Sequence, residues 1–207
     1  MGISVCIIVK NNENTLVRCL ESVKDYVDEI IVVDTGSTDR TVEIAEQFTR
    51  KIYYFEWKDN FSDAKNFALS KASEDWILAL DADESMSRND LEKIKELIKS
   101  SDFVALALIQ RSYTNEIGTF GFISCLGDEY EESKVAAGFS PGRMIRVFKN
   151  DQRIKFWGAI HDSVEKSALR IGKVKETDIQ IHHYGLLNRS SERTKYYINI
   201  EKKNLRN

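Results

Sequence analysis

Short apolar runs alternate with helical patterns over the first 85 residues, and this alternation restricts the possible folds more than any other feature of the chain. The apolar runs cover residues 3–9, 29–33, 52–55 and 76–80. Between them, apolar residues recur at helical spacing within 15–24, 42–48 and 62–72. Strands that alternate with helices in this way form a parallel sheet with helices on both faces. We therefore expect an α/β fold.

The pattern changes after Ser85. Ser87 and Asp90 form a capping box, which predicts the start of a further helix. Beyond this helix we expect a strand at 103–109, a long loop at 112–142, two paired strands at 144–148 and 154–157, and a helix at 189–207. The second half of the chain should therefore add a small antiparallel portion to the sheet.

Composition and charge narrow the classes of protein to consider. The 207 residues are 42% hydrophobic, enough for one sizeable core. Thirty basic against 33 acidic residues leave a formal charge of -3, so nothing global indicates binding to nucleic acid or to an anionic membrane. Three scattered cysteines suit reduced thiols, and neither a signal peptide nor a membrane span is expected. We expect a cytoplasmic protein, and peripheral attachment at the inner face of the membrane stays open.

Three polar loops follow predicted strands, at residues 10–14, 34–39 and 81–85. Open parallel sheets bind ligands in the crevice beyond the carboxyl ends of their strands. The three loops should therefore line one site.

The third of these loops carries the acids Asp81, Asp83 and Glu84 directly after an apolar strand. Residues two apart at the end of a strand project to the same side, so the side chains of Asp81 and Asp83 should converge on one side of the strand, with Ala82 on the other. Two converging carboxylates repel unless a cation lies between them, and their oxygens suit Mg²⁺ or Mn²⁺. The alternative is a strand that ends in solvated acids. A metal that bridges to a phosphate is the favoured interpretation.

Four segments together resemble the family 2 glycosyltransferases, which have the nucleotide-sugar-binding GT-A fold. They are the first strand with its Lys10-Asn11-Asn12-Glu13 loop, the sequence Val-Asp-Thr-Gly-Ser-Thr-Asp at 33–39, Ala-Lys-Asn-Phe-Ala at 64–68, and Asp81-Ala82-Asp83. Segments 146–150, 157–162 and 182–185 are similar to bacterial members that carry helical repeats after this domain.

The resemblance implies a fold and a division of the chain. It implies a Rossmann-like, mostly parallel sheet with helices on both faces and a small antiparallel portion. Residues 1–188 would form the GT-A domain, with a nucleotide-sugar-binding half at 1–100 and an acceptor-side half at 101–188. Residues 189–207 would start a further domain.

The resemblance also implies a donor site. Lys10, Glu13 and Asp34 would hold the base and ribose of a nucleoside diphosphate, and Lys65 would face the diphosphate. A turn residue at Asp34 and a solvated helix lysine at Lys65 are the plain alternatives. Thr35 replaces a second acid that is common in the family, which leaves the choice of uracil open.

For the metal, the resemblance implies that Asp83 binds Mn²⁺ or Mg²⁺ directly, with Asp81 reaching the ribose or the metal. It also implies that the late histidine His183 is a further ligand. Of the other two histidines, His182 is expected to be a packed residue. His161 either packs, orients its neighbour Asp162 or contacts the diphosphate.

The reaction implied is inverting transfer of a sugar from a nucleoside-diphosphate sugar, expected to be UDP-linked, to a glycan, lipid or protein acceptor. Asp162 is the candidate base, and Glu165 and Asp128 are its rivals. The competing hypotheses are a haloacid-dehalogenase-like phosphatase with Asp81 as nucleophile, a nucleotidyltransferase, and a sugar-nucleotide-binding domain without activity.

Overall fold

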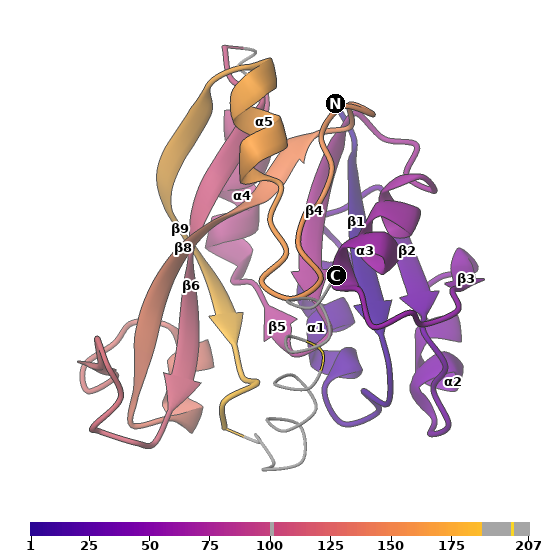
Figure 1. Ribbon diagram of the computed structural model, residues 1–207. Helices are drawn as coiled ribbons and strands as arrows, with labels where there is room; N and C mark the ends of the chain where they lie inside the picture. Colours follow the sequence, from indigo (N-terminus) through magenta and orange to yellow (C-terminus); the bar gives the residue numbers. More distant parts are fainter. Residues whose placement is uncertain (100–101, 188–199, 201–207) are drawn as a thin grey trace.

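The computed structural model describes residues 1–99, 102–187 and 200, which form a mixed sheet flanked by helices (Figure 1). The strands are β1 (Ile3–Val9), β2 (Glu29–Asp34), β3 (Ile52–Tyr54), β4 (Trp76–Asp81), β5 (Glu84–Ser85), β6 (Ala105–Thr114), β7 (Ile123–Ser124), β8 (Gly138–Lys149) and β9 (Val174–His183). The helices are α1 (Leu16–Val23), α2 (Thr41–Glu46), α3 (Phe61–Leu69), α4 (Arg88–Leu97) and α5 (Glu165–Ile171), with a 3-10 helix at Glu131–Val135. The strand order is β3-β2-β1-β4-β8-β6-β9-β5, and β7 pairs with β8.

The first four strands form the parallel part of the sheet, as the alternating pattern predicted. β1 lies between β2 and β4 and pairs in parallel with both, and β3 extends the sheet beyond β2. In β2, Ile30 and Val32 point into one core while Ile31 and Val33 point into a second core on the opposite face. The first core is covered by α1, α2 and α4, and the second by α3 and α5. The expected α/β class with helices on both faces is confirmed.

The antiparallel part begins at β8, which runs against both β4 and β6. β9 lies beside β6, parallel to it, and its end pairs with the short strand β5. In that last pair, Glu84 lies opposite His183 and Ser85 opposite His182. The turn between β4 and β5 therefore crosses from the parallel half to β9, which brings the acidic run next to the two late histidines.

The strand predicted at 144–148 is part of β8, but the second strand at 154–157 and the pairing of the two are wrong. β8 continues to Lys149 and pairs with β4 and β6, while Ile154 and Phe156 are buried in the second core without belonging to a strand. The side chain of Asn66 takes the place of a strand partner. Its Oδ1 accepts from the Phe156 amide at 2.8 Å, and its Nδ2 donates to the Phe156 carbonyl at 3.0 Å. Burial of every second residue therefore gave residues 154–157 a strand-like sequence pattern, although they do not belong to a strand of the sheet.

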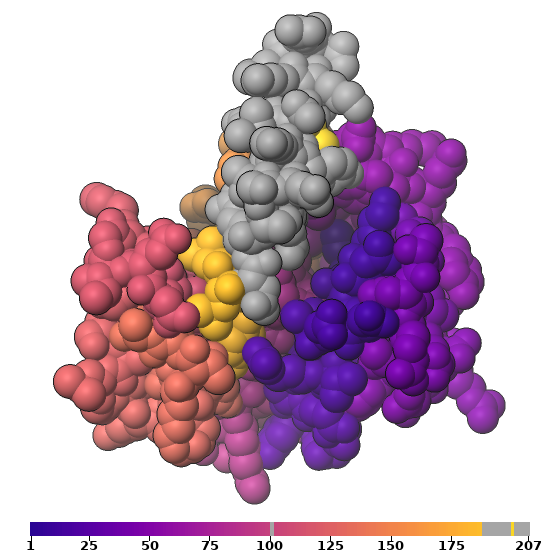
Figure 2. Space-filling view, turned by 90° about the horizontal axis from the view of Figure 1, so that it is seen from below, coloured from indigo at the N-terminus to yellow at the C-terminus, as the bar shows by residue number. Residues whose placement is uncertain are grey.

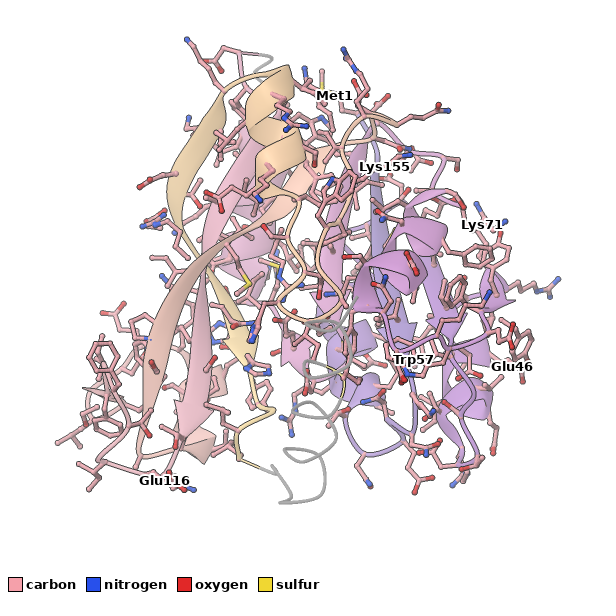
Figure 3. All side chains as sticks on the ribbon, viewed as in Figure 1. Met1, Glu46, Trp57, Lys71, Glu116 and Lys155 are labelled. Atoms are coloured by element: carbon pink, nitrogen blue, oxygen red, sulfur yellow. The ribbon has the colours of Figure 1, made fainter. Side chains whose placement is uncertain are left out.

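The predicted loop at 112–142 is also wrong in its bounds, because β6 continues to Thr114 and β8 already begins at Gly138. Residues 115–137 form an excursion that contains β7 and the 3-10 helix, and Glu116, labelled in Figure 3, lies near its start, just after β6. The buried guanidinium of Arg111 anchors this excursion by contacting both carboxylate oxygens of Asp128, one of them at 3.2 Å. The same guanidinium stacks 3.8 Å from the centre of the Phe139 ring.

Two further points concern the whole chain. The helix predicted at 189–207 lies outside the described residues, apart from Ile200. Within the described ranges, no helix has both the length and the apolar character that crossing a bilayer requires.

The Arg111–Asp128 pair yields a stability prediction. Asp128→Asn should lower the free energy of unfolding by about 3 kcal/mol, because the buried guanidinium loses its counter-charge. Urea denaturation measures this change. The matched control is Glu131→Gln in the same excursion, where the Lys134–Glu131 pair is 64% and 80% exposed, and it should change stability by less than about 0.5 kcal/mol. Equal effects of the two substitutions would contradict the prediction.

Candidate functional site

The three polar loops meet at one edge of the sheet, as expected. Val9 at the end of β1 pairs with Asp34 at the end of β2, and Ile8 pairs with Asp81 at the end of β4. The first two loops are hydrogen-bonded to each other, since the Asn11 amide donates to Ser37 Oγ at 3.0 Å. Figure 2 views this edge from below and shows the yellow residues of β9 and the segment after it between the indigo N-terminal half and the pink and orange β6–β8 half.

The acids of the first two loops hold the loop backbones in place. Asp34 is buried, and its carboxylate accepts from the amides of Gly36 and Ser37, each at 3.1 Å. Glu13 Oε2 accepts from the Arg40 amide at 3.1 Å, directly before α2. For Asp34 this is the turn geometry that the sequence left open as an alternative. Lys10, the first residue of the first loop, is exposed.

Asp81 is held between two cations. Its Oδ1 lies 3.0 Å from Lys65 Nζ, and its Oδ2 lies 2.9 Å from Arg146 Nη2. Burial opposes the ionisation of Asp81, but Arg146 and Lys65 outweigh it and hold the pKa of this carboxyl far below its ordinary value. Asp81 is therefore a carboxylate with both oxygens engaged.

Glu84 lies behind Asp81 and is buried. Its Oε1 accepts from Arg146 Nη2 at 2.9 Å and from Gln110 Nε2, while its Oε2 accepts from the Asp81 amide at 2.8 Å. Burial raises the pKa of Glu84 above its usual value, and Arg146 acts against this shift. These contacts give Glu84 a structural role: it fixes the end of β4 and orients Arg146.

Arg146 was assigned no role from the sequence. It is buried in the stretch Met144-Ile145-Arg146-Val147-Phe148 of β8, where a single charged residue interrupts an apolar strand. A buried charge requires a partner, and that requirement was the available signal. Which acids it meets depends on β8 lying next to β4.

Lys65 joins the acidic run to Asp162. Its side chain is 11% exposed, and Nζ lies 2.9 Å from Asp162 Oδ2 as well as 3.0 Å from Asp81. Burial by itself would lower the pKa of Lys65, but the charges of Asp81 and Asp162 outweigh it, so the pKa is raised. The lysine is therefore an ammonium group shared by two carboxylates.

Residues 157–163 form a closed loop that presents Asp162. Trp157 and Ser163 exchange two backbone hydrogen bonds of 3.0 Å. The loop is docked on the start of α3, because Ser62 Oγ donates to the Gly158 carbonyl at 2.6 Å and the Phe61 amide donates to the Ala159 carbonyl at 3.0 Å. Asp162 therefore reaches the helix that carries Lys65.

The rivals of Asp162 lie elsewhere. Glu165 is exposed at the start of α5, and the carboxylate of Asp128 is engaged by Arg111.

Asp83 lies beside His183, with Oδ1 3.7 Å from Nε2. Two ligands of one Mg²⁺ or Mn²⁺ ion, each about 2.1 Å from it, lie about 3–4 Å apart, so this spacing fits a shared divalent cation. Gly185 approaches the same atoms. A Cβ at this glycine would lie 2.5 Å from His183 Nε2 and 2.7 Å from Asp83 Oδ2, so the space beside the pair exists only because residue 185 has no side chain.

The expected metal trio is not assembled. Asp81 is turned to Lys65 and Arg146, and in the described ranges no group of three Asp, Glu, His or Cys side chains is placed to hold a metal ion. Of the three predicted ligands, Asp83 and His183 are the two whose side chains lie close to each other.

The other two histidines differ in environment. His161 is exposed in the 157–163 loop, with a φ of 57°. His182 is fully buried, its Nδ1 lies 2.6 Å from the hydroxyl of Tyr113, and its ring stacks on that of Tyr113. Burial, followed by the charge of Arg111, lowers the pKa of His182 to about 3. His182 is therefore a neutral packed residue.

The pKa of His182 predicts how stability depends on pH. An unfolded histidine binds a proton below about pH 6.5, whereas folded His182 stays neutral, so its contribution to stability is lost as pH falls from 6.5 toward 3. From about pH 7 to pH 5 the wild type should lose about 1–2 kcal/mol more than His182→Gln, measured by urea denaturation at each pH. His161→Gln should keep the wild-type slope; a wild-type slope in His182→Gln as well would contradict the assignment.

Comparison with known proteins identifies the relatives of this chain. The family model described as glycosyl transferase family 2 matches residues 4–176. A TPR repeat-containing protein of Synechococcus elongatus is 35% identical over 170 residues, which cover 82% of this chain and 37% of that protein. The SPbeta prophage-derived glycosyltransferase SunS of Bacillus subtilis is 32% identical over 158 residues, covering 75% of this chain and 33% of SunS. The chain thus spans about a third of the length of these relatives, and the first of them confirms the resemblance to proteins with helical repeats.

Solved structures confirm the GT-A type of fold. Staphylococcus aureus TarS in complex with UDP-GlcNAc superimposes with a TM-score of 0.63 at 16% identity, over 97% of this chain and 64% of TarS. Glucosyl-3-phosphoglycerate synthase from Mycobacterium tuberculosis with Mn²⁺ and UDP-glucose gives a TM-score of 0.58 at 15% identity, over 94% of this chain and 74% of that chain. At these identities the likeness concerns the fold alone. Since the family model covers most of the sequence, the chain belongs to glycosyl transferase family 2.

Proposed function

We propose that this protein transfers a sugar from a UDP-sugar to an acceptor, with inversion at the anomeric carbon, and that it uses Mn²⁺ or Mg²⁺. The observation that carries the proposal is the convergence of two groups at one sheet edge: Asp83 with His183, and Asp162 with Lys65 and Asp81. Family membership supports it, as do the fold relatives named as complexes with UDP-GlcNAc and with Mn²⁺ and UDP-glucose.

Asp83 and His183 would hold the divalent cation. An oxygen and an imidazole nitrogen 3.7 Å apart provide two ligands, and diphosphate oxygens and water would complete the set. Bound there, the cation would neutralise the negative charge that develops on the departing UDP.

The loops after β1 and β2 would hold the nucleotide. Asp34 already accepts two backbone amides, but a carboxylate has about four acceptor sites, so it can still accept from the base or the ribose. Glu13 and Lys10 belong to the adjoining loop, with Lys10 exposed. Asp81 and Lys65 would lie beneath the ribose and the diphosphate, where the ammonium attracts phosphate oxygens.

Asp162 would act as the base. The acceptor oxygen forms a bond to the anomeric carbon as the bond from that carbon to the diphosphate breaks, and its electron pair leaves with UDP. The acceptor proton passes to Asp162, so a single displacement requires one base and no covalent intermediate. Lys65, 2.9 Å away, would keep the carboxylate oriented.

The phosphatase alternative loses its support in this geometry. Its nucleophile would be Asp81, whose two oxygens are bound by Lys65 and Arg146. An experiment distinguishes the proposed enzyme from a binding domain without activity, since the latter would bind a UDP-sugar without releasing UDP.

Asp162→Asn separates binding from chemistry. It should lower the rate of UDP release from UDP-glucose or UDP-GlcNAc by about 10²–10⁴-fold because the base is lost. UDP affinity, measured by calorimetry with Mn²⁺, should stay within about twofold, since Asp162 is proposed to act on the acceptor and its ion pair is with Lys65. Glu165→Gln, at the exposed rival, should leave both quantities unchanged. Full activity of Asp162→Asn would remove this residue as the base.

Gly185→Ala tests the metal pair without replacing either ligand residue. Its methyl group would lie 2.5 Å from His183 Nε2, so we expect Mn²⁺ affinity in the presence of UDP to fall about tenfold or more, as followed by electron paramagnetic resonance of free Mn²⁺. Gly142→Ala is the matched control, because a Cβ there meets nothing within 4 Å. Unchanged affinity in Gly185→Ala would count against the assignment of Asp83 and His183.

A further inference from the structure

A line of polar side chains on β6 connects Glu84 to His183. Gln110 and Ser112 are two residues apart on this strand and therefore point to the same face. β6 lies parallel to β9, and Ser112 pairs with His183 across the two strands. Three hydrogen bonds link these side chains in a row. They join Glu84 and Gln110, Gln110 and Ser112, and Ser112 and His183.

The direction of the first bond is determined by Glu84. Its two oxygens face donors, namely Arg146 Nη2 at 2.9 Å and the Asp81 amide at 2.8 Å, so the carboxylate acts as an acceptor on both sides. Gln110 must then present its amide nitrogen to Glu84, because its oxygen would meet another acceptor. The oxygen Oε1 of Gln110 consequently faces Ser112.

The second bond determines the third. Ser112 Oγ lies 3.3 Å from Gln110 Oε1 and 3.1 Å from His183 Nδ1. A serine hydroxyl has one proton, and since Gln110 Oε1 can only accept, that proton is used there. Ser112 therefore offers a lone pair to His183, and Nδ1 must supply the proton of that bond.

We propose that Ser112, oriented by Gln110, holds neutral His183 in the tautomer with the proton on Nδ1, so that Nε2 keeps the lone pair that a divalent cation requires. The proposal rests on the metal site of the proposed function. In the opposite tautomer, a proton on Nε2 would point into the space beside Asp83 Oδ1, 3.7 Å away, and would have to be lost before metal could bind. Ser112 and Gln110 are thus positioning residues that act through His183.

The tautomer can be measured directly in the protein without metal. The chain has three histidines, so long-range ¹H–¹⁵N correlation spectra of ¹⁵N-histidine-labelled protein are simple, and His183→Gln assigns the signal. At about pH 8.5, His183 of the wild type should show the pattern of Nδ1–H, because Ser112 Oγ offers it a lone pair. Ser112→Ala should populate the Nε2–H form, because the acceptor for Nδ1–H is removed.

Metal affinity provides the second readout. Ser112→Ala should weaken Mn²⁺ binding in the presence of UDP by about 10–100-fold, as expected for loss of a hydrogen-bond partner of a ligand histidine. Ser112→Thr keeps a hydroxyl, so it should retain the Nδ1–H pattern and a Mn²⁺ affinity within about threefold of wild type. Ser140→Ala is the matched control, because Ser140 pairs with Ser112 on the neighbouring strand but donates to the Phe120 carbonyl, and both readouts should stay at wild-type values.

The outcomes separate this proposal from the metal assignment itself. An Nε2–H pattern in the wild type, or an unchanged Nδ1–H pattern and Mn²⁺ affinity in Ser112→Ala, would overturn the role of Ser112. A wild-type Nδ1–H pattern that Ser112→Ala abolishes supports it. If that pattern is found while the wild type binds no Mn²⁺, the tautomer control stands and the assignment of Asp83 and His183 as metal ligands fails.

Discussion

The charge balance around Asp81 is the constraint on which the rest of the site depends. Three carboxylates, Asp81, Glu84 and Asp162, share the guanidinium of Arg146 and the ammonium of Lys65. Buried charges without partners would cost several kcal/mol each, so the acids at the end of β4 can be withdrawn from water only where both cations are present. One cation comes from β8 and the other from α3, on separate sides of β4. The site therefore forms only when both halves of the sheet are in place.

These ion pairs belong to a longer network that links the two ends of the proposed active site. The contacts run from His183 through Ser112, Gln110, Glu84, Arg146, Asp81 and Lys65 to Asp162. Groups in one network respond together, so substitutions along it should be non-additive. The same contacts that hold these acids also orient a candidate metal ligand at one end and a candidate base at the other.

The errors in the second half of the chain have physical causes that particular residues show. On β6, Gln110 and Ser112 face the polar network, while Arg111 and Tyr113 are buried on the other face. Because one face of this strand is polar, its end was predicted as the start of the loop at 112–142. At residues 154–157 the opposite error occurred, because a strand was predicted where none exists. Their alternating burial resembles that of a strand, but the backbone of Phe156 bonds to the side chain of Asn66 and not to a neighbouring strand.

The sequence by itself determined the parallel half of the sheet and the edge at which the polar loops meet, because hydrophobic period and strand ends are local properties. It also indicated the acids, Lys65, Asp162 and His183 through the family resemblance. Only the tertiary structure decided which groups meet them: Arg146, Gln110 and Ser112 reach the site because β8 lies against β4 and β6, and β9 against β6 and β5. Strand register depends on packing between residues far apart in the chain, and no local pattern contains it.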